Sequence, residues 1–254
     1  MILHSQIFGE GKPFVILHGF LGMSDNWKTL GKKFAEMGYQ MHLLDQRNHG
    51  RSFRDTTFSY QVMSEDLLAY CDHHQLDSIV LLGHSMGGKT AMEFACDHPQ
   101  RVDALVAADI APKAYPKHHQ DILKALNSLD FNQLQSRGQA DKVLQEYIPE
   151  LGVRLFLLKN LYWVEKGQLG LRINLPVLTS QVAEVGMALA PEKHYDGPSL
   201  FIRGGNSGYV TDLDILSIRQ QFPAFQVETV HGAGHWLHAE QPAEFQVLVA
   251  KFIK

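Results

Sequence analysis

The sequence has 254 residues, of which 45% are apolar, and a formal net charge of −4. This is enough apolar material for one sizeable core, and the charges are so interspersed that no basic run could neutralise a row of phosphates, so nucleic acid is not an expected partner. No segment is long and apolar enough to span a membrane, and the start lacks a basic stretch followed by an apolar one, so a cytoplasmic protein is expected.

The N-terminal part alternates short apolar runs with helical patterns. Alternation over residues 2–7 predicts an edge strand, whereas 14–17 is apolar on all sides, as in a central parallel strand. A helix is expected over 27–37, ended by Gly38, and a third strand over 40–44. Strands that alternate with helices in this way pair in parallel through right-handed crossovers.

Two loops at the ends of these strands have unusual compositions. The first, residues 18–22, could offer the Phe20 N–H to a developing oxyanion, or it could be a plain tight turn. The second, residues 45–52, alternates acidic, Arg, His and Gly residues. That pattern favours a hydrogen-bonded structural turn over a direct catalytic role.

The sequence Gly-His-Ser-Met-Gly at 83–87 has the form G-x-S-x-G. It follows an apolar run at 78–82 and precedes a helical pattern at 88–96, which is the strand–turn–helix setting that this motif requires. Ser85 is therefore the candidate nucleophile, and the Met86 N–H is the candidate second oxyanion donor. The alternative is a glycine-rich turn that carries a serine by chance.

The surrounding segments continue the alternation of strand and helix patterns. A helix is expected over 63–74, and 102–108 reads as another buried strand. The two cysteines, Cys71 and Cys96, lie in predicted helices and outside any metal-type spacing. They are expected to be reduced and packed.

The pattern changes between residues 113 and 194. This stretch shows no clear strand, only helical pieces, among them an apolar run over 153–163. An insertion of this length between sheet strands predicts a helical cap on a core domain formed by 1–112 and 195–254. The excess apolar surface of this cap either packs on the core domain or lines a pocket for an apolar substrate.

The sheet pattern resumes at 199–202, followed by a helix over 211–222 and a last strand over 225–230. A hydroxyl is a poor nucleophile at neutral pH, so the serine needs a general base and an acid that orients the base. His235, in a glycine-flanked loop after the last strand, is the preferred base. His231, at the strand end, is the competing candidate.

Together these motifs resemble those of the α/β-hydrolase superfamily. The resemblance rests on His18-Gly19, the pattern D-x-R-x-H-G-x-S at 45–52, the elbow at 83–87, and Gly234-His235, and it spans nearly the whole chain. It implies an α/β fold in which helices flank a mostly parallel central sheet, with an inserted helical cap.

The orienting acid is where the sequence departs from this superfamily. The acid most commonly lies in a G-x-x-D loop after the strand before the last, but here 204–207 reads Gly-Gly-Asn-Ser. Asp109, after the strand beside the nucleophile strand, is the chosen acid, with Asp212 and Asp214 as fallbacks; alternatively, Asp109 braces its own loop. The Gly-Asn-Ser loop, Asp-Ile-Ala-Pro at 109–112 and the pattern D-x-R-N-H-G at 45–50 together resemble YbfF-type esterases. This resemblance implies hydrolysis of carboxylic esters, with acyl thioesters as the other substrate class.

The sequence therefore predicts a serine carboxylesterase that acts through an acyl-enzyme. Ser85 attacks the carbonyl, His235 takes and returns the proton, Asp109 fixes the imidazole, and the Phe20 and Met86 N–H groups bind the oxyanion. No metal or organic cofactor is expected, and the partner is a small acyl ester or thioester. The alternatives are a C–C bond hydrolase or lyase of the same fold, and a non-catalytic binding protein with a pocket.

Overall fold

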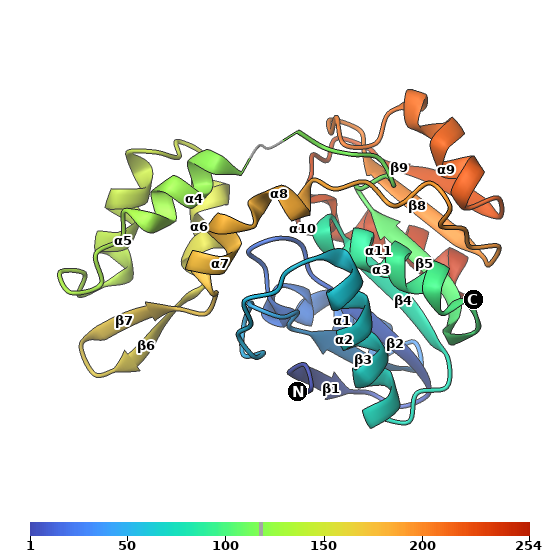
Figure 1. The fold of residues 1–254 in the computed structure, drawn as a ribbon, viewed down its shortest axis with the longest axis horizontal. Coiled ribbons are helices and arrows are strands. Elements are labelled where there is room, and N and C mark those ends of the chain that lie inside the picture. Colours follow the sequence, from blue (N-terminus) through green and yellow to red (C-terminus); the bar gives the residue numbers. More distant parts are fainter. Residues whose placement is uncertain (117–118) are drawn as a thin grey trace.

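Seven strands form the central sheet of the computed structural model, which describes residues 1–116 and 119–254 (Figure 1). Their spatial order is β1-β3-β2-β4-β5-β8-β9; β1 is antiparallel to β3, and the other neighbouring pairs are parallel. This arrangement confirms the expected α/β class. The strands are β1 Ser5–Phe8, β2 Lys12–Leu17, β3 Tyr39–Leu44, β4 Ile79–His84, β5 Val102–Ala108, β8 Ser199–Gly204 and β9 Phe225–Val230.

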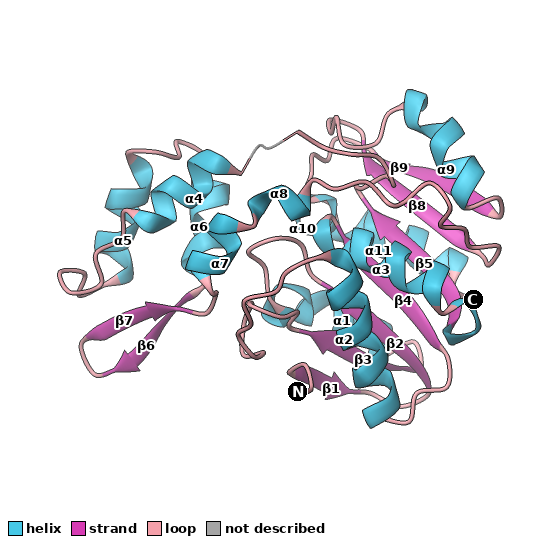
Figure 2. Cartoon of the chain, in the orientation of Figure 1, coloured by secondary structure: helices cyan, strands magenta, loops and turns pink. Residues whose placement is uncertain are grey.

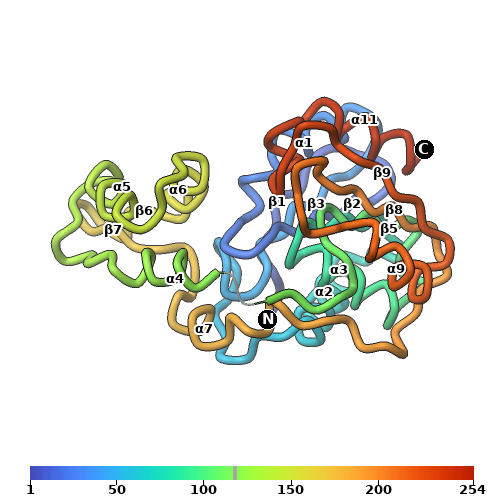
Figure 3. Tube along the Cα trace, turned by 90° about the horizontal axis from the view of Figure 1, so that it is seen from above, coloured from blue at the N-terminus to red at the C-terminus, as the bar shows by residue number. Residues whose placement is uncertain are grey.

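Helices cover both faces of the sheet, because successive side chains of a strand point to opposite faces. Val15 and Leu17 pack in one cluster with α2, α3 and α9, whereas Phe14 and Ile16 pack in another with α1 and α11. Figure 3 shows these helices on either side of the strands. The helices of the core are α1 Lys28–Ala35, α2 Tyr60–His73, α3 Met86–Asp97, α9 Ile215–Gln221, α10 Leu237–Glu240 and α11 Pro242–Phe252.

The chain between β5 and β8 leaves the sheet and forms a group of elements beside it (Figures 1 and 2). Its apolar side chains, including Leu126, Leu144 and Leu157, form a third cluster that also takes in Phe20 and Met86. The insertion therefore packs on the loops that carry the predicted site. Its elements are α4 Gln120–Asn127, α5 Arg137–Gln145, α6 Leu151–Leu158, β6 Leu161–Glu165, β7 Gln168–Leu171, α7 Leu175–Ser180 and α8 Val182–Val185.

The prediction that the insertion contains only helices is wrong. The pattern over 153–163 predicts one helix, but α6 ends at Leu158 and the chain continues into the antiparallel hairpin β6–β7. Bulky residues such as Tyr162 and Trp163 suit a strand, and Gly167 supplies the turn with a φ of +88°. Periodicity alone does not separate a short apolar strand from the end of an apolar helix.

Other predicted elements lie close to their expected places. The strands over 102–108 and 225–230 are confirmed residue for residue. Cys71 and Cys96 are free thiols in α2 and α3, and burial raises the pKa of each to about 12. In the part of the chain that the structure describes, no helix combines the length and the apolar character needed to cross a membrane.

Candidate active site

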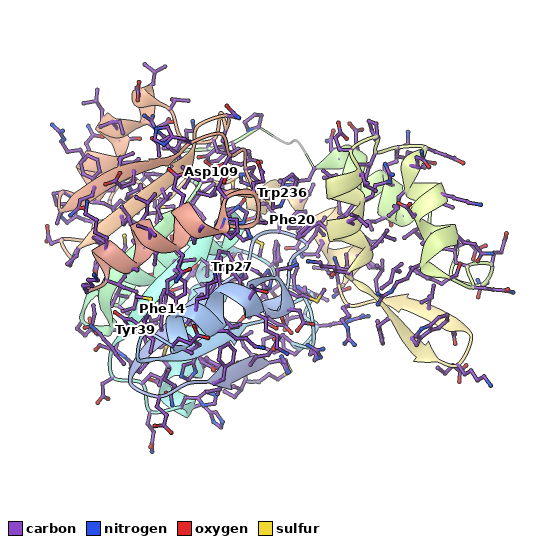
Figure 4. The ribbon with its side chains drawn as sticks, turned by 180° about the vertical axis from the view of Figure 1, so that it is seen from behind. Phe14, Phe20, Trp27, Tyr39, Asp109 and Trp236 are labelled. Atoms are coloured by element: carbon purple, nitrogen blue, oxygen red, sulfur yellow. The ribbon has the colours of Figure 1, made fainter. Side chains whose placement is uncertain are left out.

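A cavity of about 630 Å³ lies between the ends of the strands and the insertion. The core contributes Ser85, His235 and Phe20 to its lining. Figure 4 shows Phe20 and Trp236 on the side of the core that faces the insertion, with Asp109 near them. The insertion contributes apolar side chains, including Ile122, Val153, Phe156 and Leu157.

Ser85 forms the turn between β4 and α3. The strand ends at His84 and the helix begins at Met86, so one residue makes the whole change of direction. Its φ of +53° and ψ of −118° lie outside the regions that a non-glycine residue favours. The serine is held in this conformation at the edge of the cavity, with 5% of its surface exposed.

Glycines make this turn sterically possible. A Cβ atom on Gly83 would lie 2.1 Å from the backbone oxygen of Gly87, and one on Gly87 would lie 2.4 Å from that of Leu17. A Cβ on Gly88 would lie 2.5 Å from the Ile110 side chain. These distances are too short for non-bonded atoms, so the elbow requires glycine at these positions.

Asp109 leaves the sheet beside Ser85, because His84 on β4 is the register partner of Ala108 on β5. The carboxylate of Asp109 is fully buried, and its Oδ2 accepts a hydrogen bond from Nδ1 of His235 at 2.7 Å. The structure thus joins the predicted acid to the predicted base and places the base in the same cavity as Ser85. Among the described residues, no hydrogen bond joins the Ser85 hydroxyl to His235.

Ser207, at the position where the superfamily commonly has its acid, contacts the same carboxylate. Its hydroxyl donates to Oδ2 of Asp109 at 2.5 Å, and the Gly204 N–H donates to Oδ1 at 3.0 Å. Three donors therefore converge on this acid, counting His235. The sequence shows that a serine replaces the common aspartate, but this pattern alone does not predict that the serine donates a hydrogen bond to Asp109.

The fallback acids have other partners. Asp212 forms an ion pair with Arg203, with 2.7 Å between Nη1 and Oδ1. Asp214 forms one with Lys113, with 2.7 Å between Nζ and Oδ2, and it also caps the turn that begins at Thr211. Neither carboxylate lines the cavity.

The two candidate bases lie in different surroundings. The side chain of His235 is 19% exposed, and its ring stacks on that of Tyr209 with 3.8 Å between the ring centres. The side chain of His231 is 86% exposed, and its Nδ1 lies 3.0 Å from Glu244. Of the two, only His235 lines the cavity.

The loop after β2 also reaches the cavity, through Phe20. The next residue, Leu21, has a φ of +60°, and its N–H donates to Nε2 of His49 at 3.1 Å. Its backbone oxygen accepts a hydrogen bond from Asn160 at 2.8 Å. Met86 opens α3, so its N–H is one of the first four in the helix, which have no partner inside the helix.

The polar loop over 45–52 is tied into the core by hydrogen bonds. Asp45 is fully buried, and its carboxylate accepts from the backbone N–H groups of Ser24 at 2.6 Å and Arg51 at 2.8 Å. Arg47 donates to both carboxylate oxygens of Asp66, at 2.6 and 2.8 Å. These contacts give the loop a structural role, as its composition predicts.

Several histidines near the site are held neutral by burial. Burial lowers the pKa of His49 and of His238 to about 3, and the pKa of His84 falls well below its usual value. His84 donates from Nε2 to the backbone oxygen of His235 at 2.8 Å, and His238 stacks on Trp27. Despite this density of imidazoles, no cluster of three or more His, Cys, Asp or Glu residues suited to a metal ion occurs among the described residues.

Lys89 is a buried residue near the site that sequence reasoning missed. It is fully buried, and its Nζ donates to the backbone oxygens of Lys113 and Met187, at 2.7 Å each, where the chain enters and leaves the insertion. Burial lowers the pKa of this ammonium group to about 7. Its place four residues after Ser85, on a helix that packs against the sheet, is the only sequence signal for it.

Comparisons with known proteins identify the family of the chain. A family model described as alpha/beta hydrolase fold matches residues 12–242. The chain is 38% identical to Esterase YbfF of Escherichia coli (strain K12), over 92% of this chain and 89% of that protein. It is 37% identical to the sn-1-specific diacylglycerol lipase ABHD11 of Mus musculus, over 94% and 80%. A solved structure of a marine microorganism esterase superposes with a TM-score of 0.96 at 38% identity, covering 99% of both chains.

Proposed function

The chain belongs to the alpha/beta hydrolase fold family and is an esterase-type hydrolase that cleaves carboxylic esters, and on that premise we propose that Ser85 forms an acyl-enzyme with the substrate. The observation that carries this proposal is the 2.7 Å hydrogen bond from His235 to Asp109, beside the strained turn at Ser85. A nucleophile, a base and an acid are the parts that this chemistry needs.

The proton path follows from the way His235 is held. A carboxylate only accepts hydrogen bonds, so Nδ1 of His235 carries a proton and Nε2 of the neutral ring is free to take one. We propose that the Ser85 hydroxyl turns to Nε2 as the ester binds, since catalytic hydrogen bonds tighten in the substrate complex. The buried carboxylate of Asp109 then stabilises the imidazolium that forms.

Two backbone N–H groups are proposed to bind the oxyanion, those of Phe20 and Met86. When the Ser85 Oγ–carbon bond forms, the carbonyl oxygen becomes negative. Collapse of this intermediate breaks the ester C–O bond, and the leaving alkoxide takes the proton from His235. Water, deprotonated by the same imidazole, then cleaves the acyl-enzyme to release the carboxylic acid.

The cavity supports an apolar acyl group as the part of the substrate that is recognised. Side chains such as Ile122, Val153 and Phe156 line it from the insertion. We propose that residues 113–194 act as a cap domain over a core of 1–112 and 195–254, and that acyl thioesters are also substrates. A cytoplasmic location stays a prediction.

Variant Ser85→Ala tests the assignment with a series of p-nitrophenyl esters of increasing acyl length. We expect turnover to be abolished for every ester while the circular dichroism spectrum and the melting temperature stay those of the wild type. The wild type should favour apolar acyl chains over acetyl. Full residual activity of the variant would refute the role of Ser85.

A further inference from the structure

The insertion reaches the loop after β2 through one buried amide. Asn160 follows α6 and is 1% exposed. Its Nδ2 donates to the backbone oxygen of Leu21 at 2.8 Å, although the two residues are 139 positions apart. Only the NH₂ group of an amide can donate to a carbonyl oxygen, so this contact fixes the orientation of the side chain.

The core holds Leu21 from its other side. Its N–H donates to Nε2 of His49 at 3.1 Å, and Nδ1 of that ring hydrogen-bonds to the backbone oxygen of Arg47 at 2.9 Å. The φ of +60° at Leu21 is unfavourable for a residue with a large side chain, so this conformation depends on such support. Because Leu21 directly follows Phe20, a shift at Leu21 moves the Phe20 N–H.

The base of the β6–β7 hairpin links this contact to a second one. The Arg172 N–H donates to the backbone oxygen of Asn160 at 2.9 Å. Two residues on, the Asn174 N–H donates to the backbone oxygen of Asn48 at 2.9 Å, and its Nδ2 donates to Oδ1 of Asn48 at 2.9 Å. The base of the hairpin therefore bridges the loop after β2 and the loop over 45–52.

The other end of the Asn160 amide makes no comparable contact. Its Oδ1 is buried with no hydrogen-bond partner among the described residues. An unpaired amide oxygen in the interior is unfavourable, and a leucine of similar size would avoid it. Unlike leucine, the asparagine provides an N–H group that donates to the backbone oxygen of Leu21.

We propose that Asn160 is a positioning residue through which the insertion holds Leu21, and with it the Phe20 N–H, where the oxyanion develops. This inference rests on the proposed oxyanion role of Phe20. Placement of the insertion is then coupled to the chemical step by one hydrogen bond. Since the contact supports a donor that acts on the transition state, its loss lowers kcat more than it changes KM.

Variant Asn160→Asp tests this, because it keeps the size of the side chain and replaces the donor with an acceptor. With p-nitrophenyl acetate we expect kcat to fall by about tenfold to a hundredfold, with KM within about twofold. The affinity for a boronic acid transition-state analogue should fall by the same factor as kcat. Asn127→Asp is the matched control, because Asn127 also lies in the insertion and donates to the backbone oxygen of Leu123; it should keep the wild-type kcat.

An unchanged kcat in Asn160→Asp overturns the proposal, as does an equal loss of kcat in Asn127→Asp. Asn160→Ser, which is too short to reach the Leu21 oxygen, gives the same test should the first variant not fold. Labelling of the wild type with a fluorophosphonate distinguishes failure of the proposed function from failure of the positioning role of Asn160. If Ser85 is not labelled, the proposed function fails; if Ser85 is labelled and Asn160→Asp turns over normally, only the positioning role fails.

Discussion

Ser207 donates a hydrogen bond of 2.5 Å to Oδ2 of Asp109, the same oxygen that accepts from His235. Asp109 lies after β5 and Ser207 after β8, and these neighbouring strands bring the two loops together. The proposed acid thus lies after a different strand from the one in the common pattern, while the residue at the common position, Ser207, still contacts its carboxylate. The serine at 207 supports the carboxylate that replaces it.

Replacing Ser207 with alanine should lower kcat by about fivefold, because a hydrogen bond of this kind is worth about 1 kcal/mol and the freed oxygen of Asp109 is less well oriented. Steady-state kinetics with a p-nitrophenyl ester measures this loss. Ser217→Ala is the control, since its hydroxyl donates to the backbone oxygen of Asp214, just before α9, and Ser217 does not line the cavity. Equal kcat values in the wild type and Ser207→Ala would contradict the supporting role.

Replacing Asp109 with asparagine should cut kcat by about three to four orders of magnitude, because the amide can hold the wrong tautomer of His235 and cannot stabilise its cation. The double variant Asp109→Asn/Ser207→Asp should recover part of this loss, since it restores a carboxylate at the common position. Steady-state kinetics of the wild type, the single variant and the double variant measure both the loss and the recovery of kcat. A loss below about tenfold in the single variant would contradict the role of Asp109 as the orienting acid.

The elbow could be predicted because its determinants are local: a strand, glycines and a helix within a few residues of Ser85. The contact between Asp109 and His235 could be predicted from topology, since parallel strands end at one edge of the sheet. The contact from Asn160 to Leu21 could not, because it depends on how the insertion packs, which periodicity does not encode. The strand at Leu161–Glu165 could not be predicted, because an apolar run fits both helix and strand.

Acid should destabilise the fold from about pH 6.5 downward. Burial lowers the pKa of His42 to about 4 and that of His49 to about 3, so the unfolded chain binds protons that the folded chain does not. Stability is then lost as the pH falls, by up to about 2 kcal/mol per histidine between pH 7.5 and pH 5.

Urea unfolding at these two pH values measures the loss as a lower midpoint at pH 5. His42→Gln should reduce the difference, whereas His231→Gln should not, since that side chain is exposed. The same urea midpoint at both pH values in the wild type would show that the buried histidines do not cause a loss of folding stability in acid.

Replacing Lys89 with methionine should loosen the two ends of the insertion. The change removes both hydrogen bonds of Nζ while keeping the length of the side chain. The nearby amides of Tyr115 and Leu189, which donate to Gly186 and Pro112, should exchange with deuterium about tenfold faster. Exchange in β4 and β5 should not change, and neither should any of these rates in the exposed control Lys28→Met. If both amides exchange at the wild-type rate in Lys89→Met, the hydrogen bonds of Lys89 do not hold the two ends of the insertion together.

The most direct measurement is mass spectrometry of the protein after reaction with a fluorophosphonate. The relay of Ser85, His235 and Asp109 predicts one adduct, on the peptide that contains Ser85, formed quickly in the wild type and at least a thousandfold more slowly in Asp109→Asn, by about the triad factor. Ser85→Ala should give no adduct. An adduct on another residue, or equal labelling rates in the wild type and Asp109→Asn, would contradict the account.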